Sequence, residues 1–327
     1  MRPTPDRLRP FLAAAAAALL SLLPALPALS QPYPARPIRV VTPFPPGSTA
    51  DLVPRTLAQK VQVSVGQPVV IDNRPGAAGM IGADAVAKSP ADGYTVLSHT
   101  VAIAIGPHLA KSPFDLLKDL VPLTQTVSGS YVLVVHPSFP ANTLREWIDI
   151  VRRSPGRYNY ASYGSGSGPH LAMEMLKQEG GLYIVHVPFR GAAPALQELL
   201  AGRVEMAFDT SVAVLPHLRA GRLKAIAVGG PKALAALPGV PTVASVYAGF
   251  DSDGWQGLFL PAGTPPDVVA RLNAEFVRAV RAPDFVQQMA DLGFTAVGSS
   301  AADFAAFVRA EHERYGRLIR DRRIQPD

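Results

Sequence analysis

Short runs of apolar and β-branched residues alternate along almost the whole chain with longer segments in which apolar residues recur every three or four positions. The first pattern is typical of strands and the second of amphipathic helices. Strands are predicted at Ile38–Thr42, Val69–Ile71, Thr95–Ser98, Val132–Val135, Tyr158–Ala161, Ile184–Val187, Val204–Asp209 and Leu223–Val228. Helices are predicted at Thr49–Val65, Ile81–Lys88, Leu144–Arg153, Leu171–Glu179, Ala193–Ala201, Val212–Ala220, Asp267–Arg281 and Ala302–Ile319. This alternation predicts an α/β protein with mostly parallel sheets.

Several helix ends carry explicit sequence signals. Gly66 stands where a glycine commonly ends a helix, because glycine tolerates the left-handed conformation. Thr143 and Glu146 form a capping box at the start of a helix. Pro266 stands at the first turn of another helix, where its missing N–H costs nothing.

Two loops rich in glycine, serine and proline follow predicted strands. Residues 43–47 lead from one strand into a helix that opens with Ser48, and residues 162–168 do the same before His170. Backbone N–H groups at a helix N-terminus favour an anion. In open α/β sheets, ligands bind beyond the carboxyl ends of the strands. The two loops therefore predict a cleft for a small anionic solute.

The N-terminal 30 residues predict the compartment. Three arginines precede an uncharged Ala/Leu-rich run, and Ala28-Leu29-Ser30 offers small residues for cleavage. This is the pattern of a secretory signal peptide, predicted at residues 1–30. The alternative is a membrane anchor, but the apolar run is shorter than a span needs and ends in prolines. We therefore expect a mature protein in the periplasm.

Composition narrows the function classes. Removing 30 of the 327 residues leaves 297, enough for two lobes with substantial cores. The charge is +6 and falls to +4 without the three arginines and one aspartate of the signal peptide. Nucleic acid binding would need a stripe of basic residues with aromatic residues among them, and the sequence has no such stripe. The absence of cysteine excludes disulfides and thiol chemistry.

A set of short motifs then identifies a family resemblance that runs from Tyr33 to the C-terminus. The motifs, in order, are Pro43-Phe44-Pro45-Pro46-Gly47 with Asp51, Gly66-Gln67-Pro68-Val69-Val70, Asn73-Arg74-Pro75-Gly76-Ala77-Ala78-Gly79, Ala91-Asp92-Gly93-Tyr94-Thr95, Tyr160-Ala161-Ser162 through His170-Leu171-Ala172, His186-Val187-Pro188, Leu237-Pro238-Gly239-Val240-Pro241-Thr242 and Pro261-Ala262-Gly263-Thr264-Pro265. With these motifs the chain resembles the Bug-type receptors, the extracytoplasmic solute-binding proteins of tripartite tricarboxylate transporters.

The resemblance implies a type II periplasmic-binding-protein-like fold with two α/β lobes and a ligand cleft between them. Lobe 1 would comprise residues 36–130 plus 256–327, and lobe 2 residues 131–255. The implied ligand is a carboxylate: a di- or tricarboxylate, an acidic amino acid or an aromatic acid. The implied partner is a membrane permease of one small and one large subunit. We expect a monomer, no cofactor, no metal and no enzymatic activity.

In the first loop, Gly47, Ser48 and Thr49 are predicted to hold a carboxylate through N–H groups and hydroxyls. The structural alternative is ordinary N-capping by Ser48 or Thr49. Phe44 is expected to form a wall of the cleft, or only to pack. Asp51 is expected to cap or orient the helix rather than to contact an anion.

The second loop supplies more candidates. Its glycines permit close backbone approach, and its hydroxyls can donate to carboxylate oxygens. The alternative is a turn that only precedes a helix. Tyr163 stands where the family usually has a small residue, and His170 is either a ligand contact or a structural hydrogen-bond partner. The predicted ligand-binding residues of this loop are Ser162, Tyr163, Ser165, Gly166, Ser167 and His170.

Three further candidates stand at strand ends. Ser98 and Thr100 follow one strand and could reach the cleft. Asp209 ends another strand; the resemblance implies a position near the ligand, whereas the alternative is a helix cap.

Two other functions remain open. A sensory binding protein would need the same cleft and would dock on a sensor kinase instead. A secreted hydrolase is less favoured, because Tyr163 and Ser165 stand where a G-x-S-x-G motif needs glycine.

Overall fold

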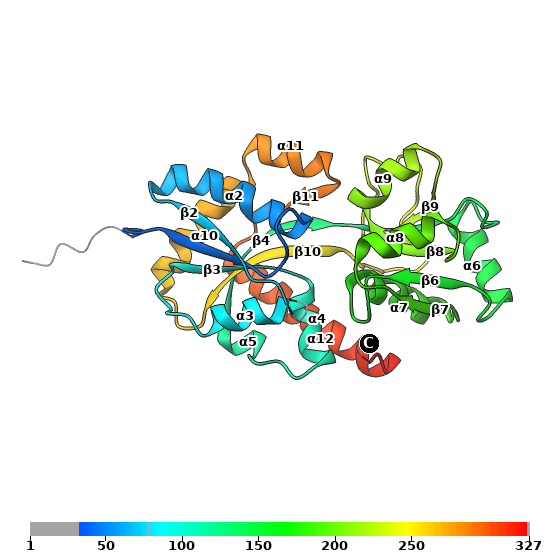
Figure 1. Cartoon of the computed structure of the whole chain (residues 1–327), viewed down its shortest axis with the longest axis horizontal. Coiled ribbons are helices and arrows are strands. Elements are labelled where there is room, and N and C mark those ends of the chain that lie inside the picture. Colours follow the sequence, from blue (N-terminus) through cyan, green and yellow to red (C-terminus); the bar gives the residue numbers. More distant parts are fainter. Residues whose placement is uncertain (1–32, 77–78, 326–327) are drawn as a thin grey trace, which may run out of the picture. The chain divides into compact units, whose positions relative to one another are not determined.

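The computed structural model describes residues 33–76 and 79–325, and residues 36–327 form one compact unit (Figure 1). The predicted signal peptide, residues 1–30, lies outside the described residues. Among the described helices, none combines the length and the apolar character needed to cross a membrane.

The first of two sheets has the strand order β11-β4-β10-β3-β1-β2. It combines strands from both ends of the compact unit. Its members are β1 (Ile38–Thr42), β2 (Val69–Asn73), β3 (Thr95–Thr100), β4 (Leu120–Gly129), β10 (Gly254–Pro261) and β11 (Phe294–Ala296).

The second sheet has the order β7-β6-β8-β5-β9 and uses only the middle of the chain. Its strands are β5 (Tyr131–Val135), β6 (Asn159–Ser162), β7 (Val185–Pro188), β8 (Met206–Thr210) and β9 (Lys224–Val228). The assignment of the two sheets to separate lobes, 36–130 with 256–327 and 131–255, stays a prediction.

The prediction of mostly parallel sheets is wrong. Of the nine strand pairings among the described residues, five are antiparallel. In the first sheet the cause is β4 and β10, two long strands that the sequence pattern did not reveal. In the second sheet the cause is β5, which pairs antiparallel with both β8 and β9. The chain leaves the first sheet along β4 and returns along β10, and these strands pair antiparallel with each other.

The helices follow the predicted positions closely, except for three that were not predicted, namely α4, α5 and α11. Their bounds are α2 (Thr49–Val65), α3 (Met80–Ala87), α4 (Ala102–Leu109), α5 (Leu116–Asp119), α6 (Leu144–Arg153), α7 (Gly168–Gly180), α8 (Ala192–Leu200), α9 (Ser211–Arg219), α10 (Pro266–Val280), α11 (Pro283–Asp291) and α12 (Ala301–Arg322).

The capping signals are confirmed. Gly66 ends α2 in the left-handed region with φ of 69°. The Thr143 hydroxyl accepts a hydrogen bond from the Glu146 N–H at 3.2 Å at the start of α6. Pro266 is the first residue of α10.

The core of the second sheet shows why β5 reads as a continuous apolar run. Leu133 and Val135 pack into a cluster with helices α6 and α7. Val132 and Val134 alternate with them and pack into a second cluster with α8 and α9. Successive side chains of a strand point to opposite faces, so a sheet covered on both faces needs apolar residues at every position.

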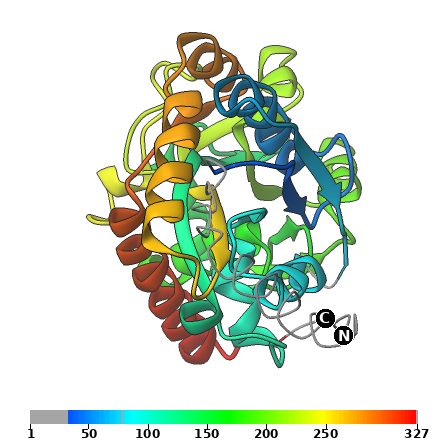
Figure 2. The same cartoon turned by 90° about the vertical axis from the view of Figure 1, so that its left-hand side faces the viewer.

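Helices also cover the first sheet. Residues of α3, α4 and α12 share one buried cluster with β1, β3 and β10. Helices α10 and α12 both pack against β4 (Figure 2). This packing fixes the strand ends from which the candidate loops emerge.

Candidate functional site

The candidate residues gather at the carboxyl ends of strands in both sheets. In the first sheet, β1 ends at Thr42 and β3 ends at Thr100. In the second sheet, β6 ends at Ser162, and its parallel neighbour β8 ends at Thr210, next to Asp209. Helices α2, α7 and α9 begin within a few residues of these ends.

Asp51 holds the first loop in place. Its Oδ2 accepts the Gly47 N–H at 2.9 Å, and its Oδ1 accepts Asn73 Nδ2 at 2.8 Å. Arg55 adds hydrogen bonds to both oxygens at 3.1 and 2.9 Å. Asn73 Nδ2 also donates to the Phe44 carbonyl oxygen at 3.0 Å. These contacts agree with an orienting role of Asp51 at the start of α2.

The charge of Asp51 is stabilised in this position. The side chain is nearly fully buried, and burial alone would raise its pKa. Hydrogen bonds from Arg55, Gly47 and Asn73 outweigh that effect and hold the pKa below its usual range. Asp51 is therefore ionised at neutral pH.

The first-loop candidates have defined places. Ser48 precedes α2 and its hydroxyl donates to the Pro45 carbonyl oxygen at 2.8 Å, so this hydroxyl does not cap the helix. Thr49 is the first residue of α2. The half-buried ring of Phe44 packs edge-on against His99, with ring centroids 5.3 Å apart. Burial lowers the pKa of His99 to about 4, which keeps this ring neutral at physiological pH.

A cavity of about 500 Å³ opens at the start of α2. Gly47 and Ser48 line it from the first loop, and Val212 of α9 lines it from the second-sheet side. Its full lining is Pro46, Gly47, Ser48, Asp51, Leu52, Arg55, Val212 and Leu292. The first loop and the start of α9 therefore share one cavity.

Ser98 and Thr100, in β3, are both engaged in hydrogen bonds within the protein. Ser98 is fully buried, and its hydroxyl accepts Gln256 Nε2 at 2.9 Å. Gln256 also donates to the Ala50 carbonyl oxygen at 2.7 Å, which ties β10 to the start of α2. The Thr100 hydroxyl accepts the Ala102 N–H at 3.4 Å at the start of α4.

Sequence reasoning missed Gln256 and Asn73 as positioning residues. Asn73 belongs to a family motif and ends β2, which was an available signal. Gln256 carried none, because β10 itself was not predicted.

Two histidines, His170 and His186, contact residues of the second loop. His186 Nε2 lies 2.6 Å from the Ser162 hydroxyl, and His170 Nδ1 accepts the Gly166 N–H at 2.9 Å. The two rings stack with centroids 4.0 Å apart and an interplanar angle of 5°. The Ser162 hydroxyl also accepts the Gly164 N–H at 3.1 Å. These contacts match the structural alternative for Ser162 and His170.

Ser167 presents a different case. It precedes α7, yet its hydroxyl makes no capping bond and has no hydrogen-bond partner among the described residues, although the atom is buried. A buried hydroxyl without a partner is costly. Within the described part of the chain, the Ser167 hydroxyl is therefore a buried polar group whose hydrogen-bonding capacity is unused.

Gly166 brings the second loop against the first-sheet helices. A Cβ at this position would lie 1.9 Å from Leu109 Cδ1 and 3.8 Å from Ile105 Cγ2 of α4. Any larger residue would therefore have to displace Leu109. The φ of +78° is a second reason for glycine, because other residues rarely adopt this backbone conformation.

Tyr163 and Asp209 form a pair at the carboxyl ends of β6 and β8 in the second sheet. The Tyr163 hydroxyl donates to Asp209 Oδ1, which also accepts the Thr210 N–H at 2.6 Å. The Thr210 hydroxyl in turn accepts the Ala213 N–H, so Thr210 and not Asp209 caps α9. Burial raises the pKa of Asp209 to about 6.

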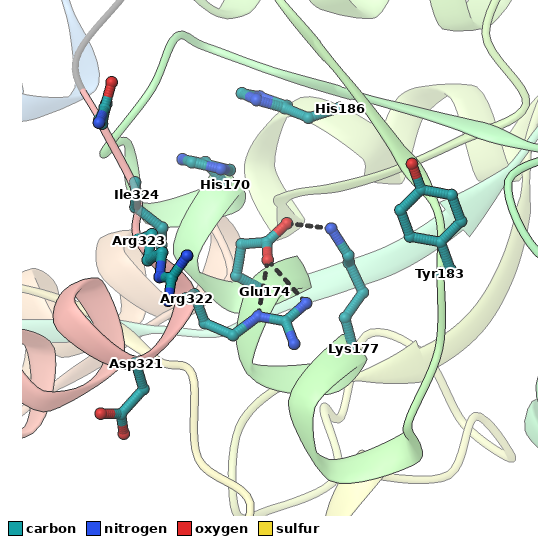
Figure 3. A pocket seen from close by; sticks show the side chains of 10 residues that line it. His170, Glu174, Lys177, Tyr183, His186, Asp321, Arg322, Arg323 and Ile324 are labelled. Atoms are coloured by element: carbon teal, nitrogen blue, oxygen red, sulfur yellow. Dashed lines mark hydrogen bonds and ion pairs between the residues drawn. The ribbon is translucent and has the colours of Figure 1, made fainter.

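His170 faces a second cavity, of about 420 Å³, on α7 and the end of α12 (Figure 3). Glu174 lines this cavity and accepts a hydrogen bond from the Tyr160 hydroxyl at 2.7 Å. It also forms ion pairs with Lys177 and with Arg322 Nη2, the latter at 3.1 Å. This ion-pair network links α7 to α12. His170 therefore lies in a different cavity from Gly47 and Ser48.

Among residues 33–76 and 79–325, no group of three or more His, Asp or Glu side chains is arranged to hold a metal ion. The polar groups around the candidate loops include hydroxyls, backbone and side-chain amides, the Arg55 guanidinium and two buried carboxylates. Such groups suit reversible binding through hydrogen bonds.

Comparison with known proteins places this geometry in a family. The model of the tripartite tricarboxylate transporter family receptor, TctC, matches residues 53–324. BugT of Bordetella pertussis is 37% identical over 293 residues, which cover 88% of this chain and 90% of BugT.

Two solved structures carry a bound acid. Rpa4515 of R. palustris, solved with adipate, is 32% identical with a TM-score of 0.79, and the match covers 90% of this chain and 100% of that one. MatC of Rhodopseudomonas palustris, solved with malate, is 30% identical with a TM-score of 0.74, over 88% of this chain and 100% of MatC.

These matches confirm the predicted α/β fold of the type II periplasmic-binding-protein kind. They also confirm the resemblance seen in the motifs. The chain belongs to the receptor family of the tripartite tricarboxylate transporters, the Bug-type solute-binding proteins.

Proposed function

We propose that this protein is a periplasmic receptor that captures a small carboxylate and delivers it to the membrane permease of a tripartite tricarboxylate transporter. The signal peptide at residues 1–30 would direct its secretion. The two sheets would be the two lobes of the receptor, and the ligand would lie between their strand ends.

The observation that carries the proposal is the buried hydroxyl of Ser167 at the N-terminus of α7, which has no hydrogen-bond partner in residues 33–76 and 79–325. A carboxylate oxygen there would accept this O–H and the first N–H groups of the helix. The start of α2, with Ser48 and Thr49, offers a second N-terminus on the other side. An acid with two carboxylates could engage both ends.

Relatives support the class of ligand. Rpa4515 and MatC were solved with adipate and malate, which are both dicarboxylates. Their chains are matched over their full length at 30% identity or more, and this protein is proposed to bind an acid of the same class. The proposed mechanism is reversible capture with hinge closure of the lobes and no covalent step.

A thermal-shift screen tests the proposal. The mature protein, stripped of ligand by unfolding and refolding, would be heated with dicarboxylates, citrate, acidic amino acids, aromatic acids and neutral sugars. Ligand at 100 times its dissociation constant adds about 2.7 kcal/mol to the free energy of unfolding, which raises the melting temperature by several degrees. A shift with acids alone supports the proposal; a shift with sugars alone contradicts it.

Delivery needs a separate test. Cells that lack the gene should take up the labelled acid more slowly, and the gene in trans should restore uptake. Unchanged uptake would contradict the transport role and would leave sensing as the better account.

A further inference from the structure

The Tyr163 side chain reaches from the carboxyl end of β6 to the neighbouring strand β8. Strands β6 and β8 are parallel neighbours, with Ala161 opposite Ala207. Tyr163 follows β6 directly, and Asp209 stands at the corresponding place near the end of β8. The phenol therefore lies over the Asp209 carboxylate and donates its O–H to Oδ1.

The pair is built into the packing of the sheet. Asp209 is only 1% exposed, so the carboxylate is shielded from solvent. Tyr163 is half-buried and packs against the apolar cluster that contains Ala161 and Ala207. A ligand group could reach Asp209 Oδ1 only if the Tyr163 side chain moved.

The hydrogen bond also fixes what this position offers to a ligand. The Tyr163 proton is directed to Asp209, so the phenol oxygen can only accept a further hydrogen bond. Burial and the nearby Asp209 charge raise the pKa of Tyr163 well above its usual value, which keeps the phenol protonated. The second candidate loop thus carries a ring that covers one oxygen, Oδ1, of a buried carboxylate.

A ligand ammonium group would need that carboxylate. Charge-assisted hydrogen bonds between ammonium and carboxylate groups are among the stronger polar contacts in proteins, and a buried ammonium without one is costly. We propose that Tyr163 is a specificity-determining residue that occupies Oδ1 of the buried Asp209 and so withholds it from the ligand, so that this receptor selects acids without an amino group over amino acids of the same length. This inference rests on the proposed function.

Calorimetric titration with matched ligand pairs tests the inference. The pairs are adipate with L-2-aminoadipate, and succinate with L-aspartate, which differ only in the 2-amino group. The proteins are the wild type, Tyr163→Ala, and Tyr163→Ala combined with Asp209→Asn. Tyr158→Ala is the matched control, because Tyr158 is a half-buried aromatic at the other end of β6, where it packs on Phe139. Circular dichroism confirms that each variant is folded.

The wild type should bind the better unsubstituted acid at least tenfold more tightly than its amino partner. Tyr163→Ala should reduce this preference at least tenfold, and the added Asp209→Asn change should restore it, because the ammonium then loses its partner. Tyr158→Ala should keep the wild-type preference.

Two results would overturn the inference while leaving the proposed function intact. One is wild-type binding of the amino acid as tight as that of the unsubstituted acid. The other is an equal change of both affinities in Tyr163→Ala. If no carboxylate bound to the wild type, the proposed function itself would fail, and the inference with it.

Discussion

Asp51 accepts the backbone N–H of Gly47 at 2.9 Å, so a buried carboxylate fixes the loop that precedes α2. The same side chain holds Asn73 and Arg55. Arg55 balances the negative charge of Asp51. Asp51 therefore repels an anion at the start of α2 less strongly than an unpaired carboxylate would. Asp51 therefore acts as a positioning residue.

Asp51→Asn should lower the free energy of unfolding by about 1–3 kcal/mol, the range for leaving buried hydrogen-bonding groups unpaired. Carboxylate affinity should also fall, because the loop loses its anchor. Urea unfolding and calorimetry measure the two effects. Asp284→Asn is the matched control, since Asp284 is an exposed partner of Lys60 and its loss should cost much less than the loss of a buried carboxylate. Equal effects of both changes would contradict the role of Asp51.

Ser167→Ala should weaken carboxylate binding by about 1–3 kcal/mol while leaving the apo protein as stable as the wild type or more so, because the hydroxyl has no partner among the described residues to lose. Ser48→Ala should act mainly on stability, since the Ser48 hydroxyl already donates to Pro45. Calorimetry and urea unfolding separate the two outcomes. Unchanged affinity in Ser167→Ala would remove the start of α7 from the site.

Asp209 should make the stability depend on pH between 5 and 7. Burial raises its folded pKa to about 6 from an ordinary value of 3.8, so the folded state holds this proton more tightly than the unfolded state. The free energy of unfolding therefore falls as the pH rises from the ordinary pKa of 3.8 toward about 6 and levels off at higher pH, and acidification reverses this loss. On going from pH 7 to pH 5, the wild type should gain about 1 kcal/mol relative to Asp209→Asn.

Asp51 acts in the opposite direction but in another range. Its folded pKa lies below its ordinary value, so its contribution to stability is present at neutral pH and is lost only in more acidic solution. Urea unfolding of the wild type and Asp209→Asn at pH 5 and pH 7 thus isolates Asp209. A gap between the two proteins that is the same at both pH values would contradict the raised pKa.

Gly166→Ala should weaken binding, because the added Cβ would lie 1.9 Å from Leu109 Cδ1 of α4 and push the second loop away. Gly239→Ala is the matched control: its φ of +84° imposes the same backbone strain, but its Cβ would meet nothing within 4 Å. Gly166→Ala should bind the acid roughly tenfold more weakly than Gly239→Ala, a difference of about 1.4 kcal/mol.

The second change Leu109→Ala should restore much of the affinity that Gly166→Ala loses, because it removes the atom in conflict. Calorimetry on the two single variants and the double variant measures this rescue. If Leu109→Ala gave no recovery, the contact between the loop and α4 would have no part in binding.

Local signals explain what could be predicted from the sequence. Helices α2 and α6 have the predicted bounds at both ends, because Gly66 and the Thr143 capping box mark them. Strand β4 contains Pro122 and polar residues, and α4 contains Gly106-Pro107, so neither resembles a regular element. Their formation depends on tertiary packing that no local pattern records.

The candidate loops could be predicted because their composition and position after strands are local properties. Their internal contacts could not. Asn73 reaches Asp51 across 22 residues, and Tyr163 reaches Asp209 across 46. Both contacts depend on which strands become neighbours, and this order follows from the topology of the complete sheets.

The central claim is that the cleft recognises the charge of a carboxylate. Calorimetric titration of the mature wild-type protein with adipate and malate, and with their uncharged diamides, tests it most directly. We predict that at least one diacid saturates one site per chain and that its diamide, equal in length, binds at least a hundredfold more weakly. A diamide that binds as tightly as its acid, or a protein that binds neither acid nor any other carboxylate, would contradict the account.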